Sequence, residues 1–578
     1  MKWGILPTPP HSLWRGRMKK SKVSVILSIV LLLSFMLTAC QPAAEQAPAE
    51  PAATEPAAPA ATPFEPWKVE APDCNYGGEF KSIESVDEYT VKFTLCAPDA
   101  AFGAKVPIPA FYIQDKDFLD ANGGDAMKMN ATPNGTGPYV LKEWIQGDHI
   151  TFETNPSYWG EAAKTKTLVF RWSAEASQRL LEIQAGTVDG IDNPTPDDFA
   201  TIEGDANLNL IPRPGLNTGY IGLNSGLEPF DDVKVRQAFA MAIDQQRIVD
   251  NYYPKGSITA NNHLPPLISP GSSPDVKWYE YDPDTAKALL AEAGYADGLE
   301  VTLSYRNVPR TYLPLPDKVA QEVQAQLAEV GVTVNVNQME STTFLDSVAA
   351  GNEAFFILGG NMDYPDPADI FNYNYGNPNK KNFGPVNPEL MEVVLAAAQT
   401  SDKAERQAHY DIANQMIKDT VPLILLAHGT SATVFKNNVE GAHASPLNKE
   451  VFAVMSNGTD QMVWMQGAEP TVLVCPDETD DETNRACSQI YEPLLMFAPG
   501  TADLVPALAE KWEANADATV WTFNLRKDVK FHNGAALDAN DVVATFVSQW
   551  DAKSPNHVGR TGSFEYFGAL FGNFMNAE

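Results

Sequence analysis

The stretch from Leu299 to Gln338 constrains the fold most, because it has the pattern of two strands joined by a helix. Its outer parts, LEVTLSY and VTVNVNQ, are rich in β-branched residues, and DKVAQEVQAQLAEV between them repeats apolar residues at helical spacing. Two strands connected through a helix lie parallel in one sheet. The sequence therefore predicts an α/β fold with parallel strand pairs.

Other segments repeat this alternation of helix and strand. A helix is predicted where Asp282 and Pro283 supply an N-cap and a first-turn proline, and it ends at Gly294. We also expect a helix over 173–184 followed by a strand over 187–191, a helix over 403–418 followed by a buried strand over 421–427, and a strand pair over 85–95. No repeat of 20 to 50 residues interrupts this order.

The first 40 residues have the features of an export signal. Lysines precede the apolar segment 23–37, which ends in Leu37-Thr38-Ala39-Cys40. This ending resembles a lipobox, in which the cysteine becomes the lipidated first residue, so Cys40 is the expected lipid attachment site. The alternative is an uncleaved membrane anchor with a chance cysteine. Met18 gives a more usual start for such a signal than Met1.

Residues 41–66 consist mainly of Ala, Pro and Glu. Such a tract lacks apolar surface for a core and is stiffened by proline, so it is expected to be an extended tether. The globular part then begins near Trp67. Its length exceeds what one core usually organises, and two or three lobes are expected.

The formal net charge of −33 argues against binding to nucleic acid or to anionic lipid by charge. Attachment to a membrane would then depend on the N-terminal lipid.

Four cysteines remain once Cys40 is assigned to lipid. An even number in an exported chain favours disulfides. Three pairings are possible, and we favour the pairing of near neighbours, Cys74 with Cys96 and Cys475 with Cys487. Zinc is the competing interpretation, but there is no CxxC pair. The eight histidines form no HxH or HExxH motif, so no metal site and no cofactor are expected.

Enzymatic activity is not expected either. The sequence has no GxSxG motif, no phosphate-binding Walker loop, and no GxGxxG after a strand. Acidic residues are plentiful, but none forms a recognisable acid/base pair, so no catalytic residue is assigned.

Seven phrases together resemble the family 5 extracellular solute-binding proteins, the di- and oligopeptide-binding components of ABC importers. They are GTGPY, NPSYWG, GLNTGYIGLN, DDVKVRQAFAMAID, YDPDTAKALLAEAG, PALAEKW and WTFNLRKDVKFHNGAALDANDV. The resemblance implies an α/β fold of the periplasmic-binding-protein type II kind, bilobal with an extra third lobe.

The order of these phrases departs from the family. PALAEKW and WTFNLRKDVKFHNG normally precede VDEYTVKFTL and GTGPY, but here they follow, at 506–534. Each phrase occurs once, which is the pattern of a circular permutation whose old ends join through NKEVFAVMSNGTD. The alternative is the fused parts of two binding proteins.

The resemblance implies the following arrangement of the chain: a signal peptide at 1–40, a tether at 41–66, lobe I at 162–225 and 435–510, lobe II at 67–161 and 511–578, and lobe III at 226–434. The chain would cross between the two halves near Asn224-Ser225 and near Phe435, and these crossings would form the hinge.

The resemblance also implies ligand-binding residues. In dipeptide-binding relatives an arginine before a Tyr-x-Pro sequence takes the ligand carboxylate, and an aspartate in a glycine-rich turn takes the ammonium. The matching residues are Arg310 in VPRTYLP and Asp363 in GGNMDYPDP, with Tyr312 and Asn217 nearby. The strand 354–359 is expected to pair with the peptide backbone.

These features together predict a lipid-anchored receptor outside the cytoplasmic membrane, in the periplasm or on the cell surface. It would be a monomer that captures di- or tripeptides by hinge closure and passes them to an ABC permease. Alternatives are a same-fold receptor for a nickel chelate, haem, an opine or an oligosaccharide, and a ligand sensor without transport.

Overall fold

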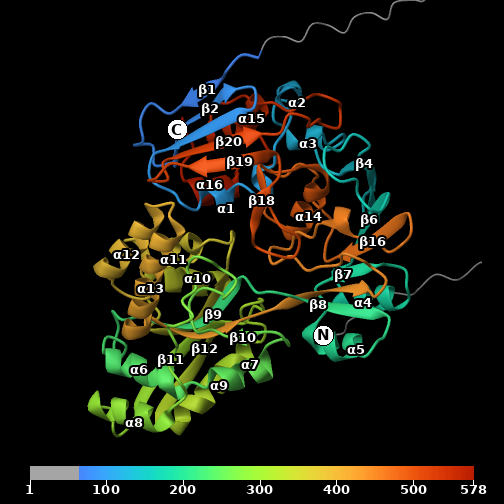
Figure 1. Ribbon diagram of the computed structural model, residues 1–578. Helices are drawn as coiled ribbons and strands as arrows, with labels where there is room; N and C mark the ends of the chain where they lie inside the picture. The colour runs from blue at the N-terminus through green and yellow to red at the C-terminus, as the bar shows by residue number, and fades with distance from the viewer. Residues whose placement is uncertain (1–63, 578) are drawn as a thin grey trace, which may run out of the picture. The chain divides into compact units, whose positions relative to one another are not determined.

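The computed structural model describes residues 64–577, and three larger sheets and one small sheet contain their strands (Figure 1). The expected signal peptide at 1–40, the lipid site Cys40 and nearly all of the tether at 41–66 lie outside the described residues. Among the helices from Phe102 onward, none is long and apolar enough to cross a membrane.

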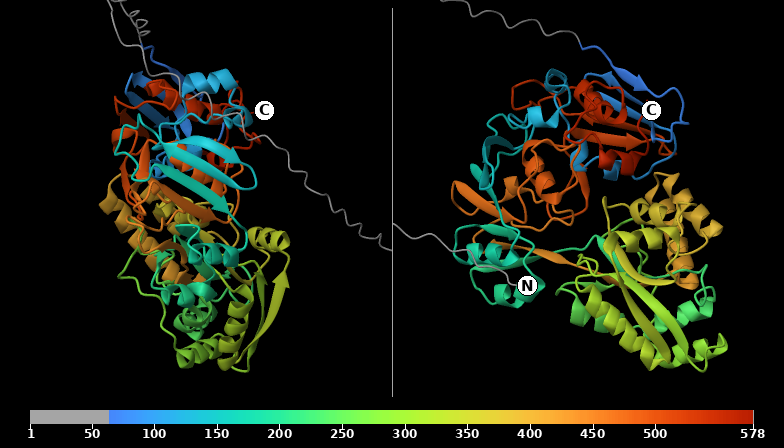
Figure 2. Two further views of the ribbon diagram at one scale, coloured as in Figure 1. Left: turned by 90° about the vertical axis from the view of Figure 1, so that its right-hand side faces the viewer. Right: turned by 180° about the vertical axis from the view of Figure 1, so that it is seen from behind.

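The first sheet joins the two ends of the described chain. Its order is β1 (Lys68–Glu70), β2 (Phe80–Asp87), β3 (Thr90–Leu95), β20 (Val520–Leu525) and β19 (Ala509–Ala514). β3 pairs antiparallel with β20, so that Val91 faces Phe523. Figures 1 and 2 show the blue and red ends of the chain side by side in this sheet. Trp521, Phe523 and Leu525 of β20 are buried, and the residues between them are less so.

Aromatic side chains from both ends of the chain form the core beside this sheet. Phe80, Phe93 and Phe102 pack with Phe523 and Phe546, with ring centroids 4.9 to 6.2 Å apart. The helices here are α1 (Phe102–Lys105), η1 (Pro109–Phe111), α2 (Lys116–Asn122), α3 (Ala126–Met129), α15 (Ala539–Trp550) and α16 (Glu565–Phe571). Neither end of the chain could bury these rings alone.

Helix α15 begins with a reciprocal cap formed by two aspartates. The Asp538 carboxylate accepts from the backbone N–H of Asn540, while the Asp541 carboxylate accepts from the backbone N–H of Asp538. This reciprocal capping satisfies donors that the first helical turn leaves unpaired.

The second sheet has seven strands from distant parts of the chain. Its order is β4 (Tyr139–Ile145), β5 (His149–Thr154), β6 (Thr167–Trp172), β16 (Gln461–Gln466), β7 (Gly190–Asp192), β15 (Ser431–Lys436) and β8 (Leu208–Arg213). β16 lies parallel to β6 and β7. The associated helices are α4 (Ala176–Gln184), η2 (Pro196–Asp198), α5 (Phe199–Glu203), η3 (Phe452–Val454) and α14 (Asp481–Ile490).

The third sheet contains the predicted strand-helix-strand unit. Its order is β10 (Ile258–Thr259), β14 (Leu423–His428), β9 (Asn217–Leu223), β13 (Phe355–Asn361), β11 (Leu299–Arg306) and β12 (Val332–Met339). β11 and β12 are parallel, and α9 (Pro316–Glu329) buries Val319, Val323 and Leu327, so that prediction is confirmed.

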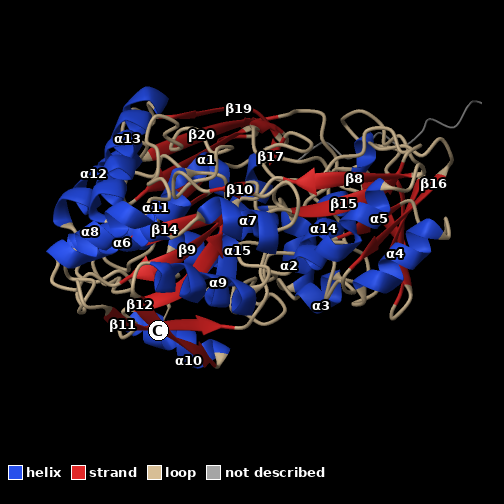
Figure 3. Ribbon diagram, turned by 90° about the horizontal axis from the view of Figure 1, so that it is seen from below, coloured by secondary structure: helices blue, strands red, loops and turns tan. Residues whose placement is uncertain are grey.

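Seven further helices accompany the third sheet. They are α6 (Val233–Ala242), α7 (Gln245–Tyr252), α8 (Pro283–Glu292), α10 (Ser341–Ala350), α11 (Pro367–Tyr375), α12 (Pro388–Ala398) and α13 (Lys403–Thr420). Figure 3 shows α6, α8, α11, α12 and α13 together at the left of the view. α8 starts at the predicted Asp-Pro signal, with Asp282 as its N-cap. The remaining small sheet pairs β17 (Leu495–Phe497) with β18 (Leu504–Pro506).

Three expected boundaries between lobes differ from the sheet pairing. The hairpin β4–β5 had been assigned to lobe II by the boundary at 161, but β5 pairs with β6 in the seven-stranded sheet. β9 lies in the third sheet although lobe I was expected to extend to 225, and β15 lies in the second although lobe III was expected to extend to 434. The reason is strand pairing, which motif positions do not reveal.

The chain therefore crosses between the second and third sheets at different points from those predicted. The crossings are 214–216, between β8 and β9, and 429–430, between β14 and β15. They touch closely, because a Cβ on Gly215 would lie 1.9 Å from the carbonyl oxygen of Gly429. Glycine is required here for backbone approach.

Both favoured disulfides are present. Cys74 is bonded to Cys96, and Cys475 is bonded to Cys487. The second bond fastens the segment before α14 to that helix. Within residues 64–577 no group of three or more histidine, cysteine or acidic side chains is arranged to hold a metal ion.

Candidate functional site

A cleft of about 560 Å³ lies at the two crossings between the second and third sheets, and Tyr566 of α16 also lines it. One wall comes from the third sheet and its loops: Leu216, Asn217, Arg310, Thr311, Asn361, Met362 and Asp363. The opposite wall comes from the second sheet and its loops, including Asn193, Arg213, Ser431, 446–449 and 479–482. Its volume is that of a typical small-molecule site.

Arg310 lies in the loop between β11 and α9, on the third-sheet wall. A short backbone bridge with Leu313 holds the loop, and the guanidinium donates one hydrogen bond to the carbonyl oxygen of Pro309, at 3.0 Å. Arg310 takes part in none of the ion pairs formed within residues 64–577. Arg310 is exposed and lines the cleft, so its remaining donors are available to bind a carboxylate in a forked geometry.

Asp363 follows β13 and lines the same wall. Its backbone N–H donates to the carboxylate of Asp369 at 2.9 Å, which fixes the turn. Partial burial raises the pKa of the Asp363 carboxyl; Lys449 opposes that shift, and Asp481 adds to it. The carboxylate makes no ion pair within the described chain and can accept from an ammonium group.

Lys449 is the main cation on the opposite wall. Burial lowers its pKa to about 8, while the charges of Asp481 and Asp363 act in the other direction. Asp481 accepts from the side-chain amide of Asn448 at 2.7 Å, and Asp480 caps α14 by accepting from the backbone N–H of Thr483. This wall therefore presents one ammonium among carboxylates.

A buried ring of four charges adjoins that wall, which one of its members, Arg213, also lines. Arg213 bonds to Asp192 at 2.9 Å and to Glu450 at 2.8 Å, and Arg485 bonds to the same two carboxylates at the same distances. All four side chains are nearly inaccessible to water. The two arginines lower the pKa of Glu450 to about 2 despite its burial. Sequence reasoning missed this ring because its members come from four distant segments without a shared motif.

Two predicted binding residues have other contacts in the structure. Tyr312 is buried outside the cleft lining, where its hydroxyl accepts from Arg306 at 3.0 Å and its carbonyl accepts from Tyr253 at 2.8 Å. Asn217 lines the cleft, but its amide donates to the carbonyl of Gly429 at 2.8 Å and accepts from the Gly429 N–H at 2.9 Å. Asn217 therefore joins the two crossing segments.

The strand expected to pair with a peptide backbone, 354–359, lies between two other strands, and that role stays a prediction. β13 lies inside its sheet, pairing with β9 along its whole length and with β11 at Ser304 and Phe356. The ring of Tyr312 lies against Gly359, so close that a Cβ there would approach it to 2.4 Å. A Cβ on Gly360 would meet nothing within 4 Å, so the open part of this strand lies near its end, at Gly360 and Asn361.

A cleft between two sheets, with the chain crossing twice between them, is the architecture expected of a solute-binding protein. The family model for bacterial extracellular solute-binding proteins, family 5, matches residues 50–382 and 503–564. The chain belongs to this family. It is therefore an extracytoplasmic binding protein and not an enzyme.

Individual relatives agree with this assignment. The dipeptide-binding protein of Escherichia coli (strain K12) is 32% identical over 384 residues, which are 65% of this chain and 71% of that protein. The structure of HbpA2 from Haemophilus parasuis aligns with a TM-score of 0.62 at 31% identity, covering 66% of this chain and 76% of that one.

A third comparison includes a ligand. The dipeptide binding protein from Pseudoalteromonas sp. SM9913, solved in complex with Met-Leu, aligns with a TM-score of 0.51 at 28% identity. The alignment covers 65% of this chain and 76% of that structure.

Proposed function

We propose that this protein is the receptor for short peptides, chiefly di- and tripeptides, of an ABC importer. The observation that carries the proposal is that Arg310 and Asp363 line one wall of the same cleft, each without an ion-pair partner in the described chain. A short peptide is a zwitterion, and a pair of opposite charges recognises its two ends. The names of the E. coli and Pseudoalteromonas relatives support the same ligand class.

In this proposal Arg310 binds the peptide carboxylate and Asp363 binds its ammonium. Each charge-assisted hydrogen bond contributes about 1.5–3 kcal/mol. Closing the cleft removes water from both charges, which strengthens the interactions and makes an unpaired charge costly. Neither contact reads the peptide's side chains, so a range of short peptides would bind.

Closure would take place at the two crossing segments, 214–216 and 429–430. A ligand that touches both walls stabilises the closed form over the open one. The closed receptor, a monomer, would then dock on the permease. A lipid on Cys40 would hold it at the outer face of the membrane.

We further propose that the chain is a circularly permuted member of its family. The order of its motifs supports this, because the resemblance implies that 506–534 would precede VDEYTVKFTL, and the family model matches two separate stretches of the chain. The expected joint, 451–459, leads directly into β16, and Gly458 turns the chain there with φ of 79°. A fusion of two genes is the alternative.

A thermal-shift screen tests the ligand class. Purified full-length protein is heated with di-, tri- and pentapeptides, and separately with a nickel chelate, haem, an opine and cello-oligosaccharides. We expect the melting temperature to rise with di- and tripeptides, because a ligand that binds the native state stabilises it. A rise with one of the other solutes and none with peptides would contradict the proposal.

Matched variants test whether the peptide-induced rise in melting temperature comes from binding in the cleft. Arg310→Gln and Asp363→Asn are expected to abolish the peptide-induced rise. The controls are Arg171→Gln and Asp297→Asn, which change the same residue types outside the cleft lining. Loss of the response in the controls as well would indicate general damage to the fold.

A further inference from the structure

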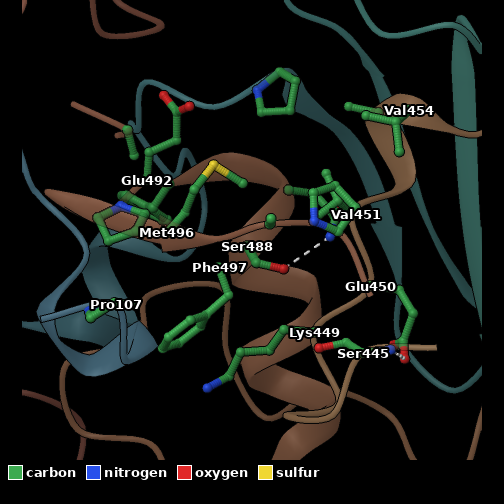
Figure 4. A pocket seen from close by; sticks show the side chains of 18 of the residues that line it. Pro107, Ser445, Lys449, Glu450, Val451, Val454, Ser488, Glu492, Met496 and Phe497 are labelled. Carbon is green, nitrogen blue, oxygen red and sulfur yellow. Dashed lines mark hydrogen bonds between the residues drawn. The ribbon is translucent and has the colours of Figure 1, made fainter. Parts of the chain in front are cut away.

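A second cavity, of about 250 Å³, lies beside the cleft, between the segment 445–454 and the segment 488–499. Its walls are mainly apolar and include Pro107, Val451, Val454, Met496 and Phe497 (Figure 4). Such a cavity is larger than one that accepts benzene, at about 150 Å³. It has room for a small ring with a short side chain.

Most polar groups around this cavity are already paired. The Glu492 carboxylate accepts from the hydroxyls of Thr136 and Tyr158 at 2.8 Å and from the indole N–H of Trp159 at 2.9 Å. Ser488 donates to the carbonyl of Arg485 and accepts from Gln489. These groups hold the walls in place and have little capacity left for a ligand.

Several donors on the cavity wall have no partner within residues 64–577, among them Tyr112, Lys449 and the exposed Lys164. The hydroxyl of Tyr112 makes none of the hydrogen bonds found there, although the residue is 93% buried, with only 7% exposed. The ammonium of Lys449 takes part in no ion pair within that range. Figure 4 shows Lys449 lying below the ring of Phe497. The cavity therefore combines apolar walls with two unpaired lysines, Lys164 and Lys449, and an unpaired hydroxyl, and Lys449 is the less exposed of the two lysines.

We infer that this cavity is a second binding site, for a small monocarboxylate with a compact apolar body. The carboxylate would pair with Lys449 and accept from Tyr112, while the body would pack on Met496, Phe497 and Val451. Removing a small apolar body from water contributes about 25 cal/mol per Å² buried. The charge-assisted bond to lysine supplies selectivity for an anion.

The second site shares a wall with the cleft. Pro446, Leu447 and Asn448 line the cleft, Ser445, Glu450 and Val451 line the cavity, and Lys449 lines both. Lys449 also acts electrostatically on Asp363. A carboxylate paired with Lys449 would reduce its positive field at Asp363. If the proposed function holds, a peptide ammonium at Asp363 would then bind more tightly, and the coupling would be reciprocal.

Titration calorimetry without peptide tests the site. 3-Phenylpropanoate is the probe, and 3-phenylpropanol is its uncharged analogue. We expect one site per chain with submillimolar affinity for the acid and at least tenfold weaker binding of the alcohol. Absence of binding by the acid up to several millimolar, or equal binding of the two compounds, would overturn the inference.

Variants test whether the probe binds in this cavity. Lys449→Met is expected to weaken binding of the acid at least tenfold. Ala498→Leu, which fills the cavity, is expected to abolish that binding. Lys553→Met, an exposed lysine outside the cavity lining, is the control. Unchanged binding of the acid in Ala498→Leu would contradict the assigned position. So would a loss of acid binding in Lys164→Met together with normal acid binding in Lys449→Met. Thermal melting of each variant without ligand checks that it is folded.

A second titration separates this site from the cleft. With a dipeptide that binds in the cleft, the probe is expected to raise peptide affinity two- to fivefold in the wild type and to leave it unchanged in Ala498→Leu. Competition between probe and dipeptide would show that the cavity is part of the cleft and would overturn the inference. If no dipeptide binds, the proposed function fails, while the first titration still decides the second site.

Discussion

At the scale of single residues, Glu450 illustrates how much a buried charge depends on its partners. Both of its oxygens are taken by arginines, Arg213 and Arg485, and it is almost fully buried. Removing one partner from a buried ionic group leaves the others uncompensated, which usually costs about 3–5 kcal/mol. Glu450→Gln is expected to lower the free energy of unfolding by that amount in urea denaturation.

The same residue predicts a dependence on pH. The pKa of Glu450 falls from 4.5 to about 2 on folding, so its contribution to stability is complete above pH 4.5 and is lost as the pH falls towards 2. Between these values the unfolding free energy of the wild type should fall more steeply than that of Glu450→Gln. Glu440→Gln, at an exposed position, should follow the wild type. Parallel slopes for all three proteins would contradict the role of the ring.

Residues that line the cleft could be predicted where a local sequence motif marks them. They could not be predicted where packing between distant segments decides their contacts. The motifs VPRTYLP and GGNMDYPDP are sufficient to select Arg310 and Asp363, and both line the cleft. Their roles stay predictions. No pattern could reveal that the Asn217 amide is used by Gly429, or that the Tyr312 ring lies against Gly359, since those contacts join segments far apart in sequence.

At the scale of elements, the crossing segments are the parts on which movement of the cleft would depend. Asn217 makes two hydrogen bonds to Gly429 and is buried. Asn217→Ala would leave a buried N–H and a buried C=O unpaired, at a cost of about 1–3 kcal/mol each. We expect the unfolding free energy to fall by about 2–4 kcal/mol.

That variant also separates a hinge role from a ligand role. Because the Asn217 amide is already paired, Asn217→Ala should weaken peptide binding much less than Asp363→Asn does. Calorimetric titration of both variants with one dipeptide provides the comparison. An equal loss in the two would assign Asn217 to the ligand.

Elements with strong local signals were predictable within a few residues. Helix α8 follows its Asp-Pro start, and α9 follows its spaced valines. Boundaries between lobes were less predictable, because they depend on strand pairing across the chain. The hairpin β4–β5 shows this. Its position in the sequence assigned it to lobe II, but the hydrogen bonds of β5 join it to β6.

At the scale of the whole molecule, the two ends of the described chain depend on each other. β3 pairs with β20, and the Phe93 ring packs on Phe523 and Phe546. Ending the chain at Glu510 would remove β20, α15 and α16 and expose that aromatic core. We expect the shortened chain to lose cooperative unfolding and to aggregate, as measured by circular dichroism and size-exclusion chromatography.

A chain ending at Asn576 is the control, since it keeps all three elements. It should unfold like the full-length protein. If the chain ending at Glu510 unfolded cooperatively with unchanged secondary structure over 64–510, the segment after Glu510 would be a dispensable tail. That result would contradict the shared core.

The central claim is that the cleft binds the two charged ends of a short peptide through Arg310 and Asp363. Titration calorimetry with a dipeptide, its N-acetyl form and its C-terminal amide tests this in the wild type, Arg310→Gln and Asp363→Asn. We predict that blocking either end of the dipeptide weakens its binding to the wild type at least tenfold. N-acetylation should not weaken binding further in Asp363→Asn, and C-terminal amidation should not weaken it further in Arg310→Gln. Binding of the blocked peptides as tightly as the free one would contradict the account.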